Sequence, residues 1–219
     1  MRSEILKRIN TGLLLFLILI LMFMSKMIYL FTIIIIFSLS FIEFTKLSKL
    51  YSKKKYIKQL LMNLIFSSYI FFILLIFIYG LNDIHFKIIL FVILLICISS
   101  DIGGILFGKI FKGPKLTKIS PNKTISGCVG SFILSISIST LLLSYIFSTD
   151  IIKNILLGFF VSLAVQIGDL FFSFLKRKAS VKNTGNILPG HGGILDRVDG
   201  ILLGMPVGLI YILVLVFTG

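Results

Sequence analysis

Acidic residues and cysteines are both scarce in this sequence. Eight Asp and Glu residues stand against 22 Lys and Arg residues among 219, so the formal net charge at pH 7 is +14. Both cysteines, Cys97 and Cys128, lie in or beside apolar segments. Two isolated thiols argue against a disulfide framework and do not suit a metal site, so we interpret both as small buried apolar residues.

The basic excess also limits the classes of partner. A basic protein can bind nucleic acid, but here the bases lie in short loops between apolar segments. That placement favours anionic lipid head groups and a phosphate-rich substrate, and we expect no nucleic-acid partner.

Apolar residues make up most of the chain. The hydrophobic content is 58% and the mean hydropathy is +1.11, which excludes a soluble domain of this length. The apolar runs do not alternate with polar residues, so we predict an all-α polytopic membrane protein and not a β-barrel. No Ala-x-Ala cleavage site follows the first run, so it is expected to be a retained helix and not a signal peptide. Without repeats or a soluble domain, residues 1–219 are interpreted as one membrane domain.

We predict seven membrane spans, each near the ~20 apolar residues that cross a bilayer. They are expected at 11–25, 27–45, 58–80, 84–100, 125–148, 151–172 and 200–218. The first and fourth are short, and the first two form either separate spans or one hydrophobic hairpin with Ser25 and Lys26 at its tip.

The Lys and Arg positions support an odd number of spans. Nineteen of the 22 lie in the N-terminal segment and in the loops at 46–58, 101–124 and 173–199, whereas the alternate connections hold only Lys26, Lys87 and Lys153. The positive-inside rule then predicts a cytoplasmic N-terminus, cytoplasmic large loops and an external C-terminus. The expected location is the cell (inner) membrane, with the active site facing the cytoplasm.

A polar, Gly-rich run at 173–199 separates the last two apolar segments. Such a run is costly to keep beside a bilayer unless something uses it. Just upstream, Asp169 lies inside an apolar segment, and Gln166, Ser173 and Arg177 share its helical stripe, as does Lys176. Asp169 either forms a structural pair with Arg177 or Lys176 or serves a site; we favour a site, because a buried charge needs a reason and further acids follow.

Two of those acids, Asp196 and Asp199, face the same way if a helix begins near residue 194. Acids also favour a first helical turn for dipole reasons alone, an alternative that is stronger for Asp199. The preceding Gly192 and Gly193 have backbone N–H groups that could cradle phosphate oxygens. Oxygen ligands without thiols favour Mg²⁺ over Zn²⁺. For the lone His191, a structural hydrogen bond is as good an interpretation as catalysis.

The earlier loop at 101–124 contains further candidates. Asp101 and Lys123 are interpreted as functional, whereas Lys112, Lys115 and Lys118 fit the positive-inside bias alone. Glycines at 103, 104 and 108 permit close approach of a backbone or helix. Glu43 is left open between a pair with Lys46 and a role in a site.

The run at 173–199 resembles the signature of the phosphatidate cytidylyltransferases, also called CDP-diacylglycerol synthases. The matching positions are Ser173, Lys176, Arg177, Lys182, Gly185, Leu188, Pro189, His191, Gly192, Gly193, Asp196, Arg197 and Asp199. Gly168-Asp169-Leu170, Asp101, Gly108, Lys109, the string 120–124 and Gly127 match as well. The resemblance covers roughly residues 95–215, the expected catalytic region.

The resemblance implies that CTP and phosphatidic acid give CDP-diacylglycerol and pyrophosphate. It also implies a metal pair, expected to be two Mg²⁺ ions, at Asp169 and Asp196, with Asp199 as a further ligand or a partner of the ligands. Phosphate clamps are assigned to Lys176, Arg177, Lys182 and Arg197. Nucleotide or phosphate contacts are assigned to Ser173, His191, Gly192, Gly193, Asp101 and Lys123. Membrane lipids are expected partners, and a homodimer is usual for the family.

The chain departs from the pattern at Asn183, where the family has Asp. Asn is nearly equivalent if that residue only caps a turn, which we favour, but metal affinity falls if it is a ligand. The chain is also shorter than expected for the family, mostly on the N-terminal side, and whether an early span or two is missing is left open. Alternative functions are a CTP-dependent lipid kinase, a cytidylyltransferase for another lipid phosphate, and a non-catalytic scaffold or transporter.

Overall fold

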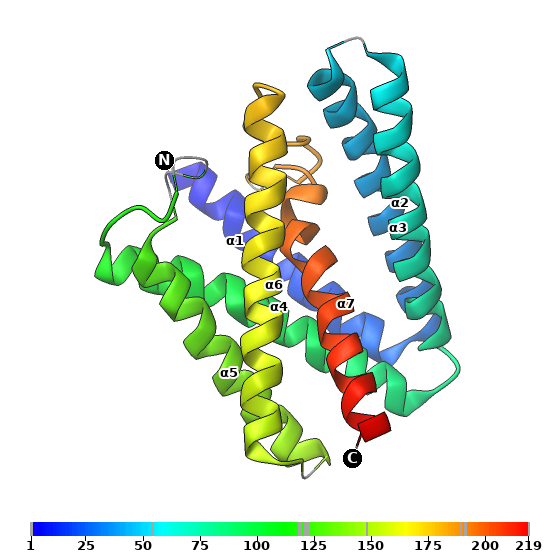
Figure 1. The fold of residues 1–219 in the computed structure, drawn as a ribbon, viewed down its shortest axis with the longest axis vertical. Helices are drawn as coiled ribbons and strands as arrows, with labels where there is room; N and C mark the ends of the chain where they lie inside the picture. The colour runs from blue at the N-terminus through cyan, green and yellow to red at the C-terminus, as the bar shows by residue number, and fades with distance from the viewer. Residues whose placement is uncertain are drawn as a thin grey trace. The chain divides into compact units, whose positions relative to one another are not determined.

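The computed structural model describes residues 2–53, 55–117, 120, 123–147, 149–188, 190 and 192–218. Over these residues the chain is all-helical, with two isolated β-bridges and no strand. Its helices, which can be followed in Figure 1, are α1 (Arg2–Met24), α2 (Lys26–Ser52), α3 (Tyr56–Tyr79), α4 (Ile84–Phe111), α5 (Ile125–Phe147), α6 (Ile151–Lys178) and α7 (Leu195–Thr218). The prediction of an α-helical membrane protein is confirmed.

Six of the described helices, α2 to α7, are long and apolar enough to cross a bilayer. In α1, the part with described side chains, Asn10–Met24, is a shorter apolar helix. Ser25 alone separates α1 from α2, so they are two helices that meet at the predicted tip.

Several helices extend beyond the predicted spans, and α4 and α6 show the reason. The span expected at 84–100 is the 28-residue α4, so Asp101 lies inside a helix and not in a loop. Likewise α6 continues past residue 172 to Lys178. A span predicted from hydropathy ends where charged residues begin, whereas a helix continues as long as its backbone hydrogen bonds are favourable. The true connection between α4 and α5 is therefore residues 112–124.

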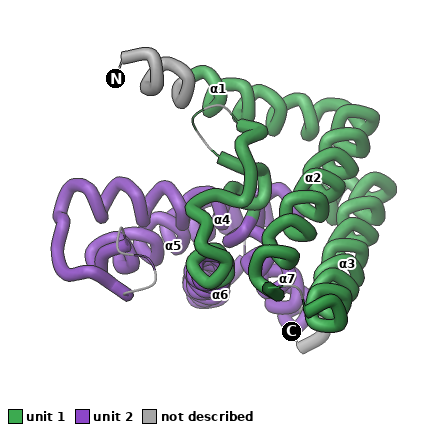
Figure 2. Tube along the Cα trace, turned by 90° about the horizontal axis from the view of Figure 1, so that it is seen from above, with its two compact units in different colours: residues 1–87, 175–198 green, residues 88–174, 199–219 purple. Residues whose placement is uncertain are grey.

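The chain divides into two compact units, coloured separately in Figure 2. The first comprises residues 1–87 and 175–198. Within it, α2 packs against both α1 and α3. Phe44 stacks on Phe66 with ring centroids 3.8 Å apart, and one turn further along α2 the buried Ser48 hydroxyl donates to Asn63 Oδ1 at 2.7 Å. Aromatic packing and a buried hydrogen bond thus fix α2 against α3.

The second unit comprises residues 88–174 and 199–219. Its helices approach closely at small residues. A Cβ on Gly158 of α6 would lie 2.7 Å from Ile136 Cα of α5, and a Cβ on Gly103 of α4 would meet the backbone carbonyl of Gly130 of α5. Such approach provides van der Waals contact between helices, which is the main attraction available to them in lipid. The expectation that the glycines of residues 101–108 permit close approach is confirmed.

Candidate functional site

Asp169 and Lys123 form an ion pair within the second unit. Asp169 lies on α6, and Lys123 lies in the connection before α5. Two backbone hydrogen bonds hold that connection: Leu116 N–H to Lys123 O at 2.7 Å and Ile125 N–H to Pro114 O at 3.0 Å. The side chains are 30% and 26% exposed, respectively. Asp169 is thus partly buried and has a basic partner, but this partner comes from another segment and not from its own helical stripe.

Asp196 and Lys176 form a second ion pair, within the first unit. Lys176 Nζ lies 2.7 Å from Asp196 Oδ1, and the two side chains are only 12% and 8% exposed. Asp196 Oδ2 accepts hydrogen bonds from Thr184 N–H at 2.9 Å and from Gly193 N–H at 3.0 Å. Because α7 begins at Leu195, the predicted helix start is confirmed. Asp196 therefore holds together residues from both sides of the polar segment at 179–194.

Glu43 of α2 is a third buried acid, and its contacts were not predicted. Its side chain accepts a hydrogen bond from the Thr184 hydroxyl at 2.8 Å and from the backbone N–H groups of Ile194 at 3.1 Å and Leu195 at 2.9 Å. The residue is only 1% exposed. The alternative of a pair with Lys46 is wrong, because the carboxylate points to the start of α7. The signal in the sequence was an acid inside the apolar segment 27–45; its partners, more than 140 positions later, gave no local signal.

The glycines of the segment at 179–194 fit around these acids. A Cβ on Gly185 or Gly193 would collide with the Glu43 carboxylate, and one on Gly192 would lie 3.0 Å from Asp196 Oδ2. Gly192 also has a φ of +87°, which an L side chain rarely adopts. Its N–H donates to Leu188 O at 3.1 Å, and the Gly193 N–H donates to Asp196. Phosphate binding by these two N–H groups stays a prediction, and it would require them to exchange partners.

The remaining predicted residues differ in exposure. Arg177, Lys182 and Arg197 are exposed, whereas Ser173 and Asp101 are partly buried. Asp199 is buried, and its Oδ1 accepts the Gly200 N–H at 2.9 Å. His191 lies outside the described residues. The exposed bases are placed to meet a soluble anion, and their roles as phosphate clamps stay predictions.

The capacity of the acids for a metal can be tested by counting their lone pairs. Among the described residues no three His, Cys, Asp or Glu side chains are grouped as a metal site. A carboxylate offers about four acceptor positions. Asp196 uses three, for Lys176, Thr184 and Gly193, and Asp169 uses one, for Lys123. Each aspartate could therefore give an oxygen to a hard cation such as Mg²⁺ if substrate oxygens or water supply the other ligands.

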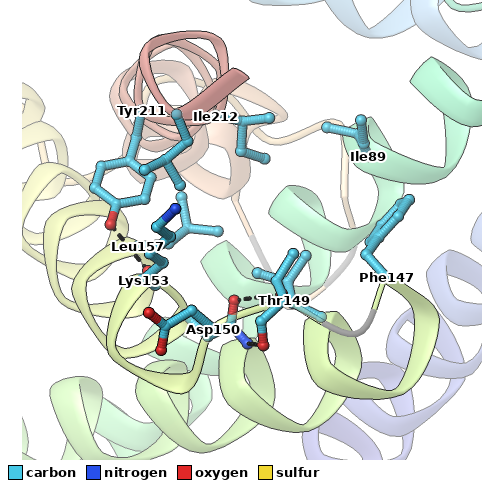
Figure 3. A pocket seen from close by; sticks show the side chains of 11 residues that line it. Ile89, Phe147, Thr149, Asp150, Lys153, Leu157, Tyr211 and Ile212 are labelled. Carbon is cyan, nitrogen blue, oxygen red and sulfur yellow. Dashed lines mark hydrogen bonds between the residues drawn. The ribbon is translucent and has the colours of Figure 1, made fainter. Parts of the chain in front are cut away.

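A pocket of about 350 Å³ lies in the second unit, near the start of α4 and α6 and the end of α5 and α7 (Figure 3). Ile89 of α4, Phe147 of α5, Lys153 of α6 and Tyr211 of α7 are among its lining residues. The Tyr211 hydroxyl donates to Lys153 O at 3.0 Å, as Figure 3 shows. None of the predicted site residues lines this pocket, so it is separate from the chemistry inferred above.

A family model and the relatives found by comparison with known proteins agree on one family. The model described as "Cytidylyltransferase family" matches residues 4–215. A protein of Helicobacter pylori strain J99 named phosphatidate cytidylyltransferase is 38% identical over 112 residues, covering 51% of this chain and 42% of that protein. Proteins of the same name are 42% identical in Rickettsia felis (53% of this chain, 56% of the relative) and 42% identical in Bacillus subtilis (55% and 45%). The chain thus spans about half the length of these relatives.

Proposed function

The chain belongs to the cytidylyltransferase family, and we propose that it transfers CMP from CTP to phosphatidic acid, releasing pyrophosphate and forming CDP-diacylglycerol. The observation that carries the proposal is the family match over residues 4–215, together with the name shared by the relatives. The two ion pairs add support, because each joins a predicted phosphate-binding lysine to a predicted metal-binding aspartate.

The proposed step is a displacement at phosphorus. A phosphate oxygen of phosphatidic acid attacks the α-phosphorus of CTP, a new P–O bond forms, and the bond to the β-phosphate oxygen breaks as pyrophosphate leaves. The nucleophile is already an anion, so no strong general base is needed. Catalysis then depends on positioning and on neutralising charge, as in phosphoryl transfer generally.

The basic side chains supply that neutralisation in the proposal. Arg177, Lys182 and Arg197 are exposed, so in this proposal they can reach the phosphates of CTP. Lys176 and Lys123 each pair with an aspartate in the structure. An incoming phosphate gives these two lysines a competing anion, and release of the lysine frees a carboxylate oxygen for a cation.

Mg²⁺ would be held by Asp169, Asp196 and Asp199 in this proposal. When bound, it would neutralise negative charge on the triphosphate and on leaving pyrophosphate. The hard oxygen ligands and the acceptor positions left at Asp169 and Asp196 suit this ion.

We also propose that the chemistry takes place at the cytoplasmic face of the cell membrane. The chain is an integral membrane protein, and 19 of its 22 bases lie on one side of the predicted topology. That side is expected to face the cytoplasm, where CTP is found. It is also the side expected to meet the anionic lipid surface. A homodimer remains part of the proposal on family resemblance alone.

A product assay tests the proposed function. The protein is purified in detergent and given Mg²⁺, labelled CTP and phosphatidic acid. We expect labelled CDP-diacylglycerol and one equivalent of pyrophosphate. Release of CDP with a phosphorylated lipid would instead establish a lipid kinase, and a folded protein that forms no product from either class of lipid would overturn the proposal. Addition of a chelator, followed by Mg²⁺, tests the metal in the same assay.

A further inference from the structure

We propose that Glu43 is a positioning residue for CTP: its buried carboxylate fixes the polar segment at 179–194 to the start of α7. The inference rests on the proposed function for its kinetic consequences, but its structural basis is separate. All of the residues involved lie within the first unit.

The hydrogen bonds of Glu43 reach both ends of that segment. Thr184 lies near its beginning, and the backbone N–H groups of Ile194 and Leu195 lie at its end. One carboxylate thereby joins two points that are ten residues apart in the chain. Any loss of these acceptors leaves a buried hydroxyl and two helix-start N–H groups without partners, so the segment between them loses its fixed geometry.

The charge of Glu43 is balanced by these donors and not by a base. Neither ion pair formed by described residues includes Glu43. Instead, the carboxylate lies at the positive end of α7, where two N–H groups point at it. Glu43 thus occupies the position at a helix N-terminus where an anion binds most readily. Phosphate recognition by this segment is then left to groups other than the N–H groups of Ile194 and Leu195.

Two glycines indicate that the carboxylate is built into the segment. A Cβ on Gly185 would meet Glu43 Oε1, and a Cβ on Gly193 would meet Glu43 Oε2. Neither glycine has the positive φ that would by itself require glycine. The demand for glycine at 185 therefore comes from close approach to Glu43, and at 193 from close approach to Glu43 and to the Thr184 hydroxyl. Gly185 thus gives a test of the contact.

The same segment carries Lys182, which is assigned to the phosphates of CTP and lies two residues before Thr184. Asp196, the predicted metal ligand, follows Leu195 directly at the start of α7. Asp196 and Glu43 share Thr184 as a donor: its N–H goes to Asp196 and its hydroxyl to Glu43. Movement of Thr184 would therefore displace both contacts together. A change at Glu43 should therefore weaken CTP binding. The KM for phosphatidic acid serves as an internal reference, because no residue that Glu43 contacts has been assigned to that substrate.

The first experiment compares Glu43→Gln with Ser48→Ala. Glutamine is nearly isosteric, but its amide nitrogen cannot accept from these donors. Ser48 is a matched control, since it is a buried polar residue of the same helix with one hydrogen bond to Asn63. We expect Glu43→Gln to raise the KM for CTP about tenfold, with the KM for phosphatidic acid within twofold of wild type. Ser48→Ala should leave both KM values within twofold. A loss of kcat alone in Glu43→Gln would mean a merely structural role.

Rescue at Thr184 tests the partner. Thr184→Ser keeps the hydroxyl and should keep the KM for CTP within twofold, whereas Thr184→Val should raise it severalfold.

A double-mutant cycle then tests the contact with Gly185. Gly185→Ala should raise the KM for CTP when Glu43 is present and should change it much less in a Glu43→Asp background, where the shorter side chain makes room. Additive effects would overturn the proposed contact.

Amide hydrogen exchange separates this inference from the proposed function. Exchange in peptides that cover residues 183–195 should accelerate at least tenfold in Glu43→Gln and not in Ser48→Ala. This readout needs no substrate. If wild-type protein makes no CDP-diacylglycerol but the exchange result holds, the proposed function fails while the positioning contact stands. Unchanged exchange in Glu43→Gln would overturn the inference, whatever the activity.

Discussion

The ammonium of Lys176 and the carboxylate of Asp196 are 2.7 Å apart, although 20 residues separate them in the chain. Lys176 lies in the last turn of α6 and Asp196 in the first turn of α7. A base at a helix C-terminus and an acid at a helix N-terminus each complement the helix dipole, so both charges are placed favourably before they meet. Their pairing joins the end of α6 to the start of α7, and so brings together the two ends of the polar segment between these helices.

This geometry predicts unequal costs for removing the two partners. Asp196→Ala removes the carboxylate that accepts from the Lys176 ammonium and from two N–H groups, and should destabilise the protein by about 3–5 kcal/mol. Lys176→Met leaves the carboxylate with its two backbone donors and should cost about 1–3 kcal/mol. Thermal unfolding in detergent measures both, with the exposed Arg177→Met as control. Equal losses for Asp196→Ala and Lys176→Met would contradict the assigned hydrogen bonds.

The pair of Lys123 and Asp169 should matter more for activity than for stability. Its side chains are 26% and 30% exposed, and ion pairs with access to solvent contribute at most about 1 kcal/mol. We therefore expect Lys123→Gln to unfold at nearly the wild-type temperature and to lose at least tenfold in kcat/KM for CTP. Lys115→Gln, an exposed base of the same connection, should stay within twofold. A stable, fully active Lys123→Gln protein would remove Lys123 from the site.

Helix packing in the second unit should not tolerate a methyl group on Gly158. A Cβ there would lie 2.7 Å from Ile136 Cα and 2.9 Å from Ser135 O, atoms that move only if α5 moves. Gly158→Ala should therefore destabilise the protein by about 1–3 kcal/mol, as overpacking usually does. Gly12→Ala is the matched control, because nothing lies within 4 Å of its added Cβ. The comparison uses thermal unfolding, and similar transition temperatures for the two variants would refute the close contact.

Asn183→Asp tests the one departure from the family signature. A Cβ on the neighbouring Gly192 would lie 3.3 Å from Asn183 Cγ, so residue 183 packs against the turn at Gly192. A role in the turn makes Asn and Asp nearly equivalent. We expect the Mg²⁺ concentration that gives half-maximal activity to change less than twofold. A decrease of tenfold or more would identify the family Asp as a metal ligand and this enzyme as weakened by its loss.

The helices could be predicted from the sequence because a bilayer imposes one requirement on each of them, a long apolar run. Asp169 and Asp196 could be recognised for the opposite reason, since an acid is costly near such a run. The length of α4 could not be read from hydropathy, because Asp101 and Lys109 lower it while the helix continues. Helix geometry persists through polar residues when neighbouring helices or water satisfy them.

The partners of the acids were much harder to predict than the acids themselves. The bases considered as structural partners of Asp169 were those of its own helical stripe, yet its partner is Lys123, 46 residues earlier. One interpretation paired Glu43 with Lys46 on the same helix, yet the hydrogen-bond donors to Glu43 lie at residues 184–195. Helical periodicity reports neighbours at three and four positions, whereas tertiary contacts depend on packing that one sequence does not reveal.

The separation between Glu43 and its donors also sets an order of events during synthesis. Thr184 and Leu195 lie 141 and 152 residues after Glu43. At about 5–20 residues per second, a ribosome makes that stretch in roughly 7–30 s. For that interval α2 carries an acid whose final partners do not yet exist, and an unpartnered charge in lipid is costly. We therefore expect the end of α2 that holds Glu43 to remain near the membrane surface, in contact with water, until α7 leaves the ribosome.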